Sequence, residues 1–246
     1  MQNEIISNTS QYYNWTSLHV AAVGGNITRV MELFHEGYRD INAEDTNTLT
    51  ALHLAVFFNS TEVVKLLLQQ HDIDVNAQTT LGDTPLHLAA LIKRSQCMTE
   101  LLSHKGINLT VANNDTNTAL HLAAMSGCSE CIRMIIQYNI DINVKGKHKW
   151  TPLHYAAMRG MTDCVNILLL HPDIKVTAHD EVGRAPFLLA LNNGHVHCVD
   201  ALLQHQQITL KQVSNKQEDS VDESTENDQP ESSNKVAGKK EESVEL

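Results

Sequence analysis

One pattern of 33 or 34 residues recurs six times along the chain and constrains its fold more than any other feature. Each repeat carries a short signature around a large apolar anchor, written TSLHVAA in the first repeat and TPLHLAA in the third. The anchors are separated by 34, 34, 34, 33 and 34 positions, and they are Leu18, Leu52, Leu86, Leu120, Leu153 and Phe187. A period of this length predicts a stack of two-helix units that bury their apolar faces only against their neighbours.

Three features recur together in the repeats: the period, the signature and a second apolar run, such as VVKLLL from residue 63. In this combination the sequence resembles the ankyrin-repeat family over about residues 12 to 205. The resemblance implies an all-α solenoid of stacked helix-turn-helix units with β-hairpin fingers, and it implies protein binding without naming a partner. We expect an N-terminal segment at 1–11, a repeat domain at 12–210 with repeats starting near 15, 49, 83, 117, 150 and 184, and a tail at 211–246.

Charge and hydropathy argue against several classes of function. The net charge is −11; residues 211–246 hold ten acids and five bases, which gives −5 and leaves −6 for the rest. Nucleic-acid binding asks for a clustered basic face, and the one local candidate is the short group Lys145, Lys147, His148 and Lys149. The chain begins without a secretory signal, and no apolar run is long enough to span a membrane. We expect a soluble cytoplasmic or nuclear monomer that binds neither nucleic acid nor membrane and needs no cofactor.

The turn and finger residues of each repeat carry their own expectations. Glycine occupies the turn between the two helices in four repeats, whereas Asn59 and Lys93 stand there in repeats two and three. Lysine adopts a left-handed conformation less readily than asparagine, which predicts an altered turn in repeat three. In the fingers, side-chain amides can satisfy backbone groups, and the residues so placed are Asn42, Asn76 and Asn143. The sixth repeat relaxes the pattern, as a capping unit does.

Histidines and cysteines form ladders that could suggest chemistry, but the repeat explains them. The histidines stand at 19, 53, 87, 121 and 154; stacked helices lie about 8–10 Å apart, too far for neighbouring imidazoles to share a zinc ion. In the resembled family this histidine makes structural hydrogen bonds. The cysteines fall eleven residues after an anchor, where a small buried hydrophobe is expected, and they are Cys97, Cys131, Cys164 and Cys198.

Cys128 and Cys131 form a single CxxC, which without a second CxxC gives only weak support for a zinc or redox site. Reduced thiols are therefore expected. The chain has no Gly-rich phosphate loop, no G-x-S-x-G elbow and no H-E-x-x-H. We therefore expect neither catalytic residues nor metal ligands, and the protein is not expected to be an enzyme.

Apolar residues five positions after the anchors, and in repeats two and three also at the next position, mark a candidate binding surface near the ends of the inner helices. Contiguous exposed apolar surface usually marks an interface, and the alternative is that these side chains pack between repeats. The candidates are Phe57, Phe58, Leu91, Ile92, Met125 and Met158. Finger tips supply further expected contacts at Asp83, Asn117, Lys147, Lys149 and Trp150. Trp150 beside basic residues has the composition of an interface hot spot, and it could equally pack under its own hairpin.

The tail and the cellular setting leave alternatives open. From Lys211 onward the chain has no aromatics and few aliphatics, so disorder is expected. Six repeats followed by an acidic tail resemble the inhibitory proteins that hold Rel-type transcription factors in the cytoplasm. The ending EESVE at 241–245 resembles the EExxE block of effectors that bacteria such as Legionella export by a type IV system. Candidate modification sites are Ser220 and Thr225 for phosphorylation and Asn76 for hydroxylation, in a segment that resembles hydroxylated ankyrin sequences.

Overall fold

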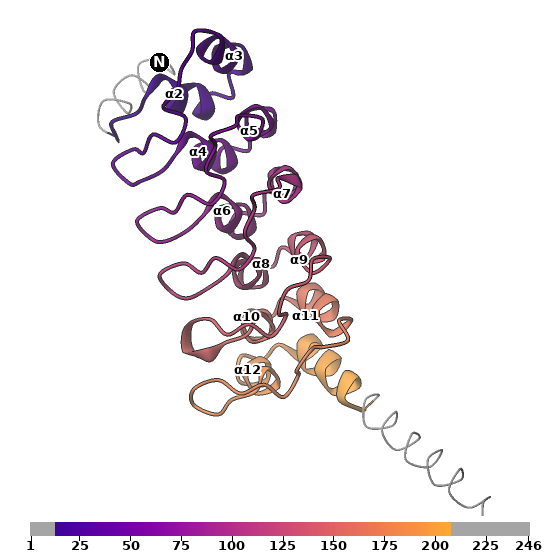
Figure 1. Ribbon diagram of the computed structural model, residues 1–246. Helices are drawn as coiled ribbons and strands as arrows, with labels where there is room; N and C mark the ends of the chain where they lie inside the picture. The colour runs from indigo at the N-terminus through magenta and orange to yellow at the C-terminus, as the bar shows by residue number, and fades with distance from the viewer. Residues whose placement is uncertain (1–12, 208–246) are drawn as a thin grey trace, which may run out of the picture. The chain divides into compact units, whose positions relative to one another are not determined.

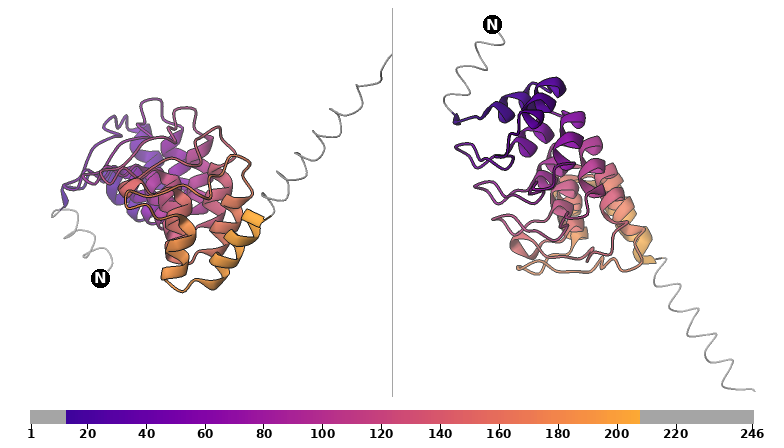
Figure 2. Two further views of the ribbon diagram at one scale, coloured as in Figure 1. Left: turned by 90° about the horizontal axis from the view of Figure 1, so that it is seen from below. Right: turned by 45° about the horizontal axis from the view of Figure 1, so that its top comes forward.

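The computed structural model describes residues 13–207 as a stack of helix pairs (Figure 1). The helices that begin at the signature form one layer, and the helices that follow them form a second layer beside it, as two further views also show (Figure 2). The inner layer consists of α2 (Ser17–Val23), α4 (Ala51–Phe57), α6 (Pro85–Leu91), α8 (Ala119–Ser126), α10 (Pro152–Arg159) and α12 (Pro186–Asn192). The outer layer consists of α3 (Ile27–His35), α5 (Thr61–Leu68), α7 (Ser95–Ser103), α9 (Ser129–Ile135), α11 (Thr162–Leu169) and a helical segment from 196 to 207. The family resemblance predicted this all-α solenoid.

Small and branched residues fill the space between the layers. Alanines three and four positions after the anchors are almost fully buried, for example Ala89 and Ala90 in α6. They let each inner helix pack against the next one along the stack, and the outer helices add large buried side chains such as Leu67 and Leu101. Each repeat therefore buries its apolar face against its neighbours, as a repeat architecture requires.

The fingers are tight loops that project to one side of the stack (Figure 1). In the first, one carboxylate oxygen of Asp45 accepts hydrogen bonds from the backbone N–H groups of Asn47 and Leu49, at 2.7 and 2.9 Å. The Asp45 N–H donates to the Leu49 carbonyl at 2.9 Å and closes the loop. Side-chain and backbone bonds of this kind hold the fingers, and no β-strand forms within residues 13–207.

Finger asparagines connect neighbouring repeats. The Asn42 amide donates to the carbonyl of Asp72 at 2.7 Å and accepts from the N–H of Asp74 at 2.8 Å. Asn76 and Asn143 make the corresponding pairs of bonds, which confirms that these amides satisfy finger backbone groups. In the third repeat Thr110 stands in this place, and its hydroxyl bonds Asn108 in its own finger instead.

The sixth repeat is less polar than a capping unit is expected to be. Leu191 and Val196 expose 52% and 64% of their surface, and Leu188 and Leu203 each expose 38%.

Among residues 13–207 no helix has both the length and the hydropathy needed to cross a membrane. The expected acidic tail and the candidate sites Ser220 and Thr225 lie outside the described residues.

Candidate protein-binding face

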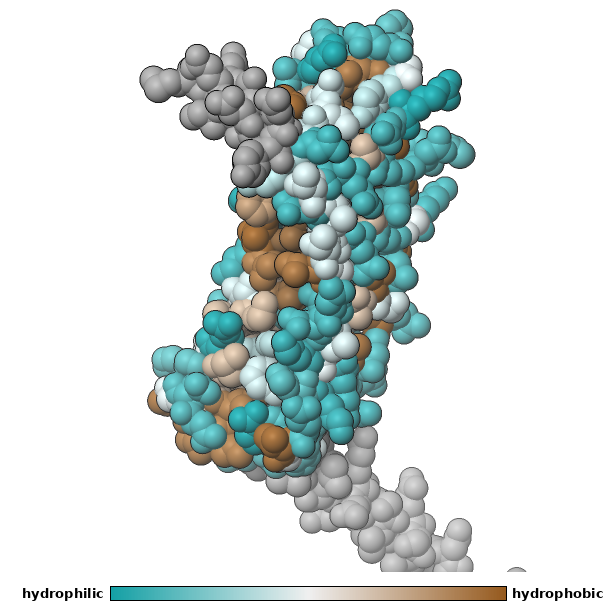
Figure 3. Space-filling model, turned by 90° about the vertical axis from the view of Figure 1, so that its left-hand side faces the viewer, coloured by the Kyte–Doolittle hydropathy of each residue, from teal (hydrophilic) through white to brown (hydrophobic). Residues whose placement is uncertain are grey.

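The inner-helix ends, here meaning the last residues of the inner helices and the residue that follows each, carry the exposed apolar side chains predicted from the sequence. Phe57, Phe58 and Leu91 expose 49%, 47% and 36% of their surface. The rings of Phe57 and Phe58 meet edge to face with centroids 5.3 Å apart. Figure 3, seen from the finger side, shows hydrophobic surface gathered midway along the stack and again at its C-terminal end.

The other predicted members of this surface are half-buried. Ile92, Met125 and Met158 are each half-buried, and Met125 packs against the core. The structure therefore brings the large exposed side chains together in repeats two and three, and leaves repeats four and five with one half-buried methionine each.

The turns after the inner helices also differ between repeats two and three, which have Asn59 and Lys93 there, and repeats four and five, which have glycine. Asn59 and Lys93 have φ of +59° and +58°, a left-handed conformation that favours glycine. Glycine at the equivalent position of repeat five has a steric reason, because a Cβ on Gly160 would lie 2.6–2.8 Å from the ring of His195. In repeat four the place of His195 is taken by Cys128, which is small and buried. The next repeat therefore leaves room for a side chain at position 93 of repeat three.

Cross-repeat hydrogen bonds fix the positions of the inner-helix ends. An Arg94 Nη donates to the carbonyl of Phe57 at 3.2 Å, and the Ser126 hydroxyl donates to the carbonyl of Ala90 at 2.8 Å. His195 Nε2 lies 3.0 Å from the carbonyl of Met158 and serves the same purpose two repeats later. Arg94 was not among the residues expected to matter here, although the sequence carries a signal: it is a cation at a turn position that elsewhere holds neutral residues.

Two expected finger-tip contacts are corrected by the structure. The side chains of Asp83 and Asn117 are buried, with 7% and 4% of their surface exposed. The Asp83 carboxylate accepts from the side-chain amide of Asn113 at 2.7 Å, and the Asn117 carbonyl oxygen accepts from the Tyr155 hydroxyl at 3.0 Å. Both residues end a finger and turn inward toward the next repeat, so their side chains hold the finger base and are not available to a partner.

Trp150 is also engaged within the protein. Its Nε1 donates to a carboxylate oxygen of Asp180 in the next finger at 3.2 Å, and its ring meets that of Tyr155 edge to face at 5.0 Å. Trp15 donates to Asp45 in the same way. Of the two alternatives for Trp150, this geometry is the packing alternative, although the partner is the neighbouring finger and the ring stays half-exposed.

Two of the four basic side chains of this finger are paired with acids of the neighbouring fingers. Lys147 lies 2.7 Å from Asp115, and His148 lies 2.6 Å from Glu181, so acids of both neighbouring fingers face the group. Lys149 is exposed. Burial opposes ionisation of the nearby Asp180, but hydrogen bonds from Arg184, Val182 and Trp150 overcome it and lower its pKa to about 2. Ion pairs and hydrogen bonds therefore join this finger to both of its neighbours, while Lys145 and Lys149 stay exposed.

The histidine ladder is structural, as the repeat implied. In five repeats a threonine N–H donates to Nδ1 of the histidine three residues later, at 3.0–3.2 Å. Nδ1 is therefore the unprotonated nitrogen, and Nε2–H donates to a carbonyl at the base of the next finger, at 2.9–3.2 Å. Burial lowers the pKa of all five imidazoles, to about 4 for His53 and His121. The ladder joins successive repeats in its neutral form.

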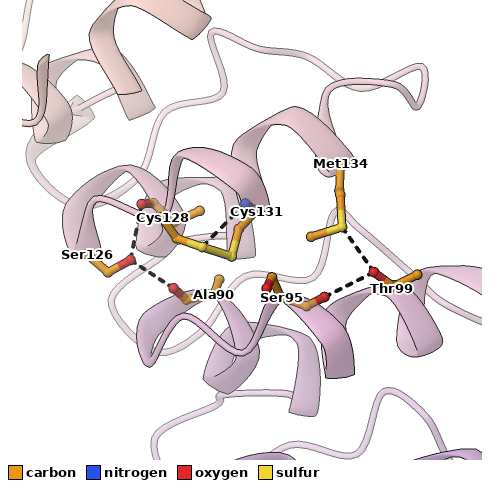
Figure 4. The surroundings of a disulfide bond; sticks show 8 residues. Ala90, Ser95, Thr99, Ser126, Cys128, Cys131 and Met134 are labelled. Carbon is orange, nitrogen blue, oxygen red and sulfur yellow. Dashed lines mark hydrogen bonds between the residues drawn. A yellow bond between two sulfur atoms is a disulfide. The ribbon is translucent and has the colours of Figure 1, made fainter. Parts of the chain in front are cut away.

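Three of the ladder cysteines are free and buried, as expected: Cys97, Cys164 and Cys198. The expectation for the CxxC pair was wrong, because Cys128 and Cys131 form a disulfide with their Cα atoms 5.2 Å apart (Figure 4). Cys128 is the N-cap residue of α9, and Cys131 lies three positions later in the first turn of that helix. Residues three apart lie on the same side of a helix, so the two sulfur atoms can meet. Among residues 13–207 no group of histidine, cysteine and acidic side chains is arranged to hold a metal ion.

Comparisons with known proteins agree with this architecture. A family model described as ankyrin repeats matches three times, over residues 2–79, 71–146 and 143–212. An ankyrin repeat domain from Acinetobacter baumannii is similar at 26% identity and a TM-score of 0.68, covering 77% of this chain and 97% of that one. The ankyrin repeat domain of Bcl-3 is similar at 29% identity and a TM-score of 0.70, covering 78% and 86%. A search of curated proteins found no match.

Proposed function

The chain belongs to the ankyrin-repeat family, and on that premise we propose that it is a non-catalytic adaptor or competitive inhibitor that binds a protein on its inner-helix ends. Repeats of this family typically mediate protein binding. The observation that carries the proposal is the exposure of Phe57, Phe58 and Leu91 in adjacent repeats. Large apolar side chains that lie together on a surface are the usual core of an interface.

Packing within the stack does not account for these side chains. The core beneath them is complete, since Leu52, Val56 and Ala90 are fully buried. Phe57 and Phe58 contact one another at a 5.3 Å centroid distance while about half of each remains exposed to solvent. Hydrogen bonds from Arg94 and Ser126 to backbone carbonyls hold the surrounding backbone, so a partner meets a preorganised surface.

A capture experiment with matched variants tests the proposal. The full chain, a Phe57→Ser/Leu91→Ser variant and a Met31→Ser/Leu170→Ser control are compared for the proteins that they capture. Met31 and Leu170 expose 56% and 78% of their surface beside the outer helices, so the control removes the same number of apolar side chains elsewhere. We expect proteins that the full chain and the control capture equally and the first variant loses, with thermal unfolding showing all three folded. Equal capture by all three, or unfolding of the Phe57→Ser/Leu91→Ser variant, would contradict the proposal.

Inhibition of a transcription factor is a second candidate function. The likeness to Bcl-3 favours it, because that domain is described as a unique member of the IkappaB protein family. The test is a binding measurement between the purified chain and a Rel-type transcription factor. Binding that Phe57→Ser/Leu91→Ser abolishes would support this candidate, and no binding at micromolar concentrations would remove it.

Further proposals concern the tail and modification. Export as a bacterial effector rests on the ending at 241–245, outside the described residues; deletion of 237–246 should abolish type IV export, and unchanged export would remove the idea. Phosphorylation is proposed at Ser220 or Thr225. Hydroxylation is proposed at Asn76, whose amide is fixed between Gly106 and Asn108. If the intact mass shows no added oxygen after exposure to a cytosolic asparagine hydroxylase, hydroxylation of Asn76 is ruled out.

A further inference from the structure

We infer that the segment bound on the inner-helix ends is an acidic peptide with large apolar side chains; the inference rests on the proposed function above. Its first support is an absence of carboxylates from the inner helices. None of the helices α2, α4, α6, α8, α10 and α12 contains an aspartate or a glutamate. The chain up to residue 210 carries a net charge of −6, so the absence is local and not a property of the whole sequence.

The charged side chains that do stand here are cations. The turns that follow the inner helices also lack acids, and the charged residues of helices and turns together are Lys93, Arg94 and Arg159. Lys93 and Arg159 are exposed and make no ion pair with another residue in the range 13–207. Arg94 uses one Nη for the carbonyl of Phe57 at 3.2 Å, beside the aromatic pair.

Acids at the border of repeats two and three do not neutralise these cations. At the start of the outer helix, repeat two has Glu62, which is paired with Lys65 at 2.8 Å, and repeat three has the uncharged Gln96. Glu130 and Asp163 occupy similar places in repeats four and five, and the charge of Lys93 acts on Cys164, which follows Asp163. The apolar surface of repeats two and three is therefore bordered by unpaired positive charge, which favours a negatively charged partner.

Lys93 has a left-handed backbone conformation that lysine adopts at a cost in energy. Its φ of +58° is one that glycine adopts at lower cost, and glycine does stand at this turn in four of the six repeats. A lysine there puts a cation in the turn that follows Leu91 and Ile92, at some cost in stability. Strain of this kind is often found at functional sites, where binding offsets it.

A complementary segment must supply two things: aromatic or large aliphatic side chains for the exposed surface of Phe57, Phe58 and Leu91, and carboxylates for Lys93 and Arg94. The tail at 211–246 is acidic but has no aromatic residue and few aliphatic ones. A segment of a separate protein is therefore the occupant that fits both requirements.

Selection from a displayed library of random peptides tests this chemistry. The full chain is the bait, and peptides that also bind Phe57→Ser/Leu91→Ser are removed by counter-selection. We expect the selected pool to be enriched in Asp or Glu together with Phe, Trp, Leu or Ile, relative to the starting library. A neutral or basic pool, a pool bound equally by the double variant, no enrichment, or peptides selected only when the tail after residue 210 is deleted would each overturn the inference.

A pair of glycine variants then separates charge from stability. Lys93→Gly relieves a left-handed lysine and removes its charge, whereas Asn59→Gly relieves a left-handed asparagine at a similar φ without a change of charge. Both should raise the melting temperature, by about 2–4 °C. Lys93→Gly should weaken binding of a selected peptide about three- to fivefold, and Asn59→Gly should not. Equal affinities for the two variants would show that Lys93 plays no part in recognition.

These outcomes are distinguishable from failure of the proposed function. If the capture experiment shows partners that depend on Phe57 and Leu91 but the selected peptides are basic, the binding face stands and the acidic chemistry is wrong. If no captured protein depends on those two residues, the proposed function itself fails.

Discussion

Repeats two and three share their scaffold with repeats four and five and differ from them where the inner helices end. In both regions a threonine, a neutral histidine and a finger carbonyl form the same hydrogen-bonded ladder. At the helix ends, repeats two and three expose Phe57, Phe58 and Leu91, with side-chain-bearing residues in left-handed turns. Repeats four and five have half-buried methionines and glycine turns. The scaffold and the exposed surface are therefore separable here, because the hydrogen bonds of the ladder are the same whichever side chains the helix ends expose.

The largest expected effect is a loss of stability in acid, shared by both regions. The folded-state pKa of His53 and His121 is about 4, below the ordinary 6.5, so only the unfolded chain takes up protons as pH falls below 6.5. Their stabilising effect is complete above pH 6.5 and is lost as pH falls toward 4. Each should contribute about 2 kcal/mol less at pH 5 than at pH 7. Urea unfolding at the two pH values measures the change, and an unchanged free energy of unfolding would contradict the neutral ladder.

Removal of one ladder histidine should have a somewhat smaller effect, equal in the two regions. His53→Leu and His121→Leu each leave a threonine N–H buried without its acceptor, and each removes the hydrogen bond from the imidazole to a finger carbonyl. We expect each to lower the free energy of unfolding by about 3 kcal/mol. A cost confined to one of the two variants would break the claim that the scaffold is shared.

Glycine turns should show the contrast between the regions directly. Gly160→Ala places a Cβ against the His195 ring in a left-handed conformation and displaces the hydrogen bond from that ring to Met158. We expect a loss of about 2 kcal/mol in the free energy of unfolding, measured by urea denaturation. A neutral result would mean that the stack relaxes at this turn, and would remove the steric reason for glycine in repeat five.

The reverse change in repeat two should have the smallest effect and the opposite sign. Asn59→Gly relieves a left-handed asparagine and should add up to about 1 kcal/mol of stability. Asn59 Oδ1 also accepts a weak hydrogen bond from the Cys97 thiol at 3.7 Å, whose loss reduces the gain. A clear destabilisation would show that the packing of the Asn59 side chain contributes more to stability than its left-handed conformation costs.

The sequence alone predicted the scaffold better than the surface. The period of 33 or 34 residues determines which residues face the core, so the anchors, the alanines and the histidine ladder could all be placed in advance. The orientation of finger residues could not, because Asp83 and Asn117 turn inward only through bonds to Asn113 and Tyr155, about one repeat away. The Cys128–Cys131 disulfide was missed because a lone CxxC does not reveal its oxidation state.

The central claim is that partners meet the inner-helix ends of repeats two and three. The most direct test is photo-crosslinking from a benzophenone amino acid placed at position 57, 91, 158 or 170 of the full chain. We expect crosslinked partner from 57 and 91, and little from the equivalent end in repeat five at 158 or from the exposed site beside α11 at 170. Crosslinking from 170 alone, or from all four positions equally, would contradict the claim.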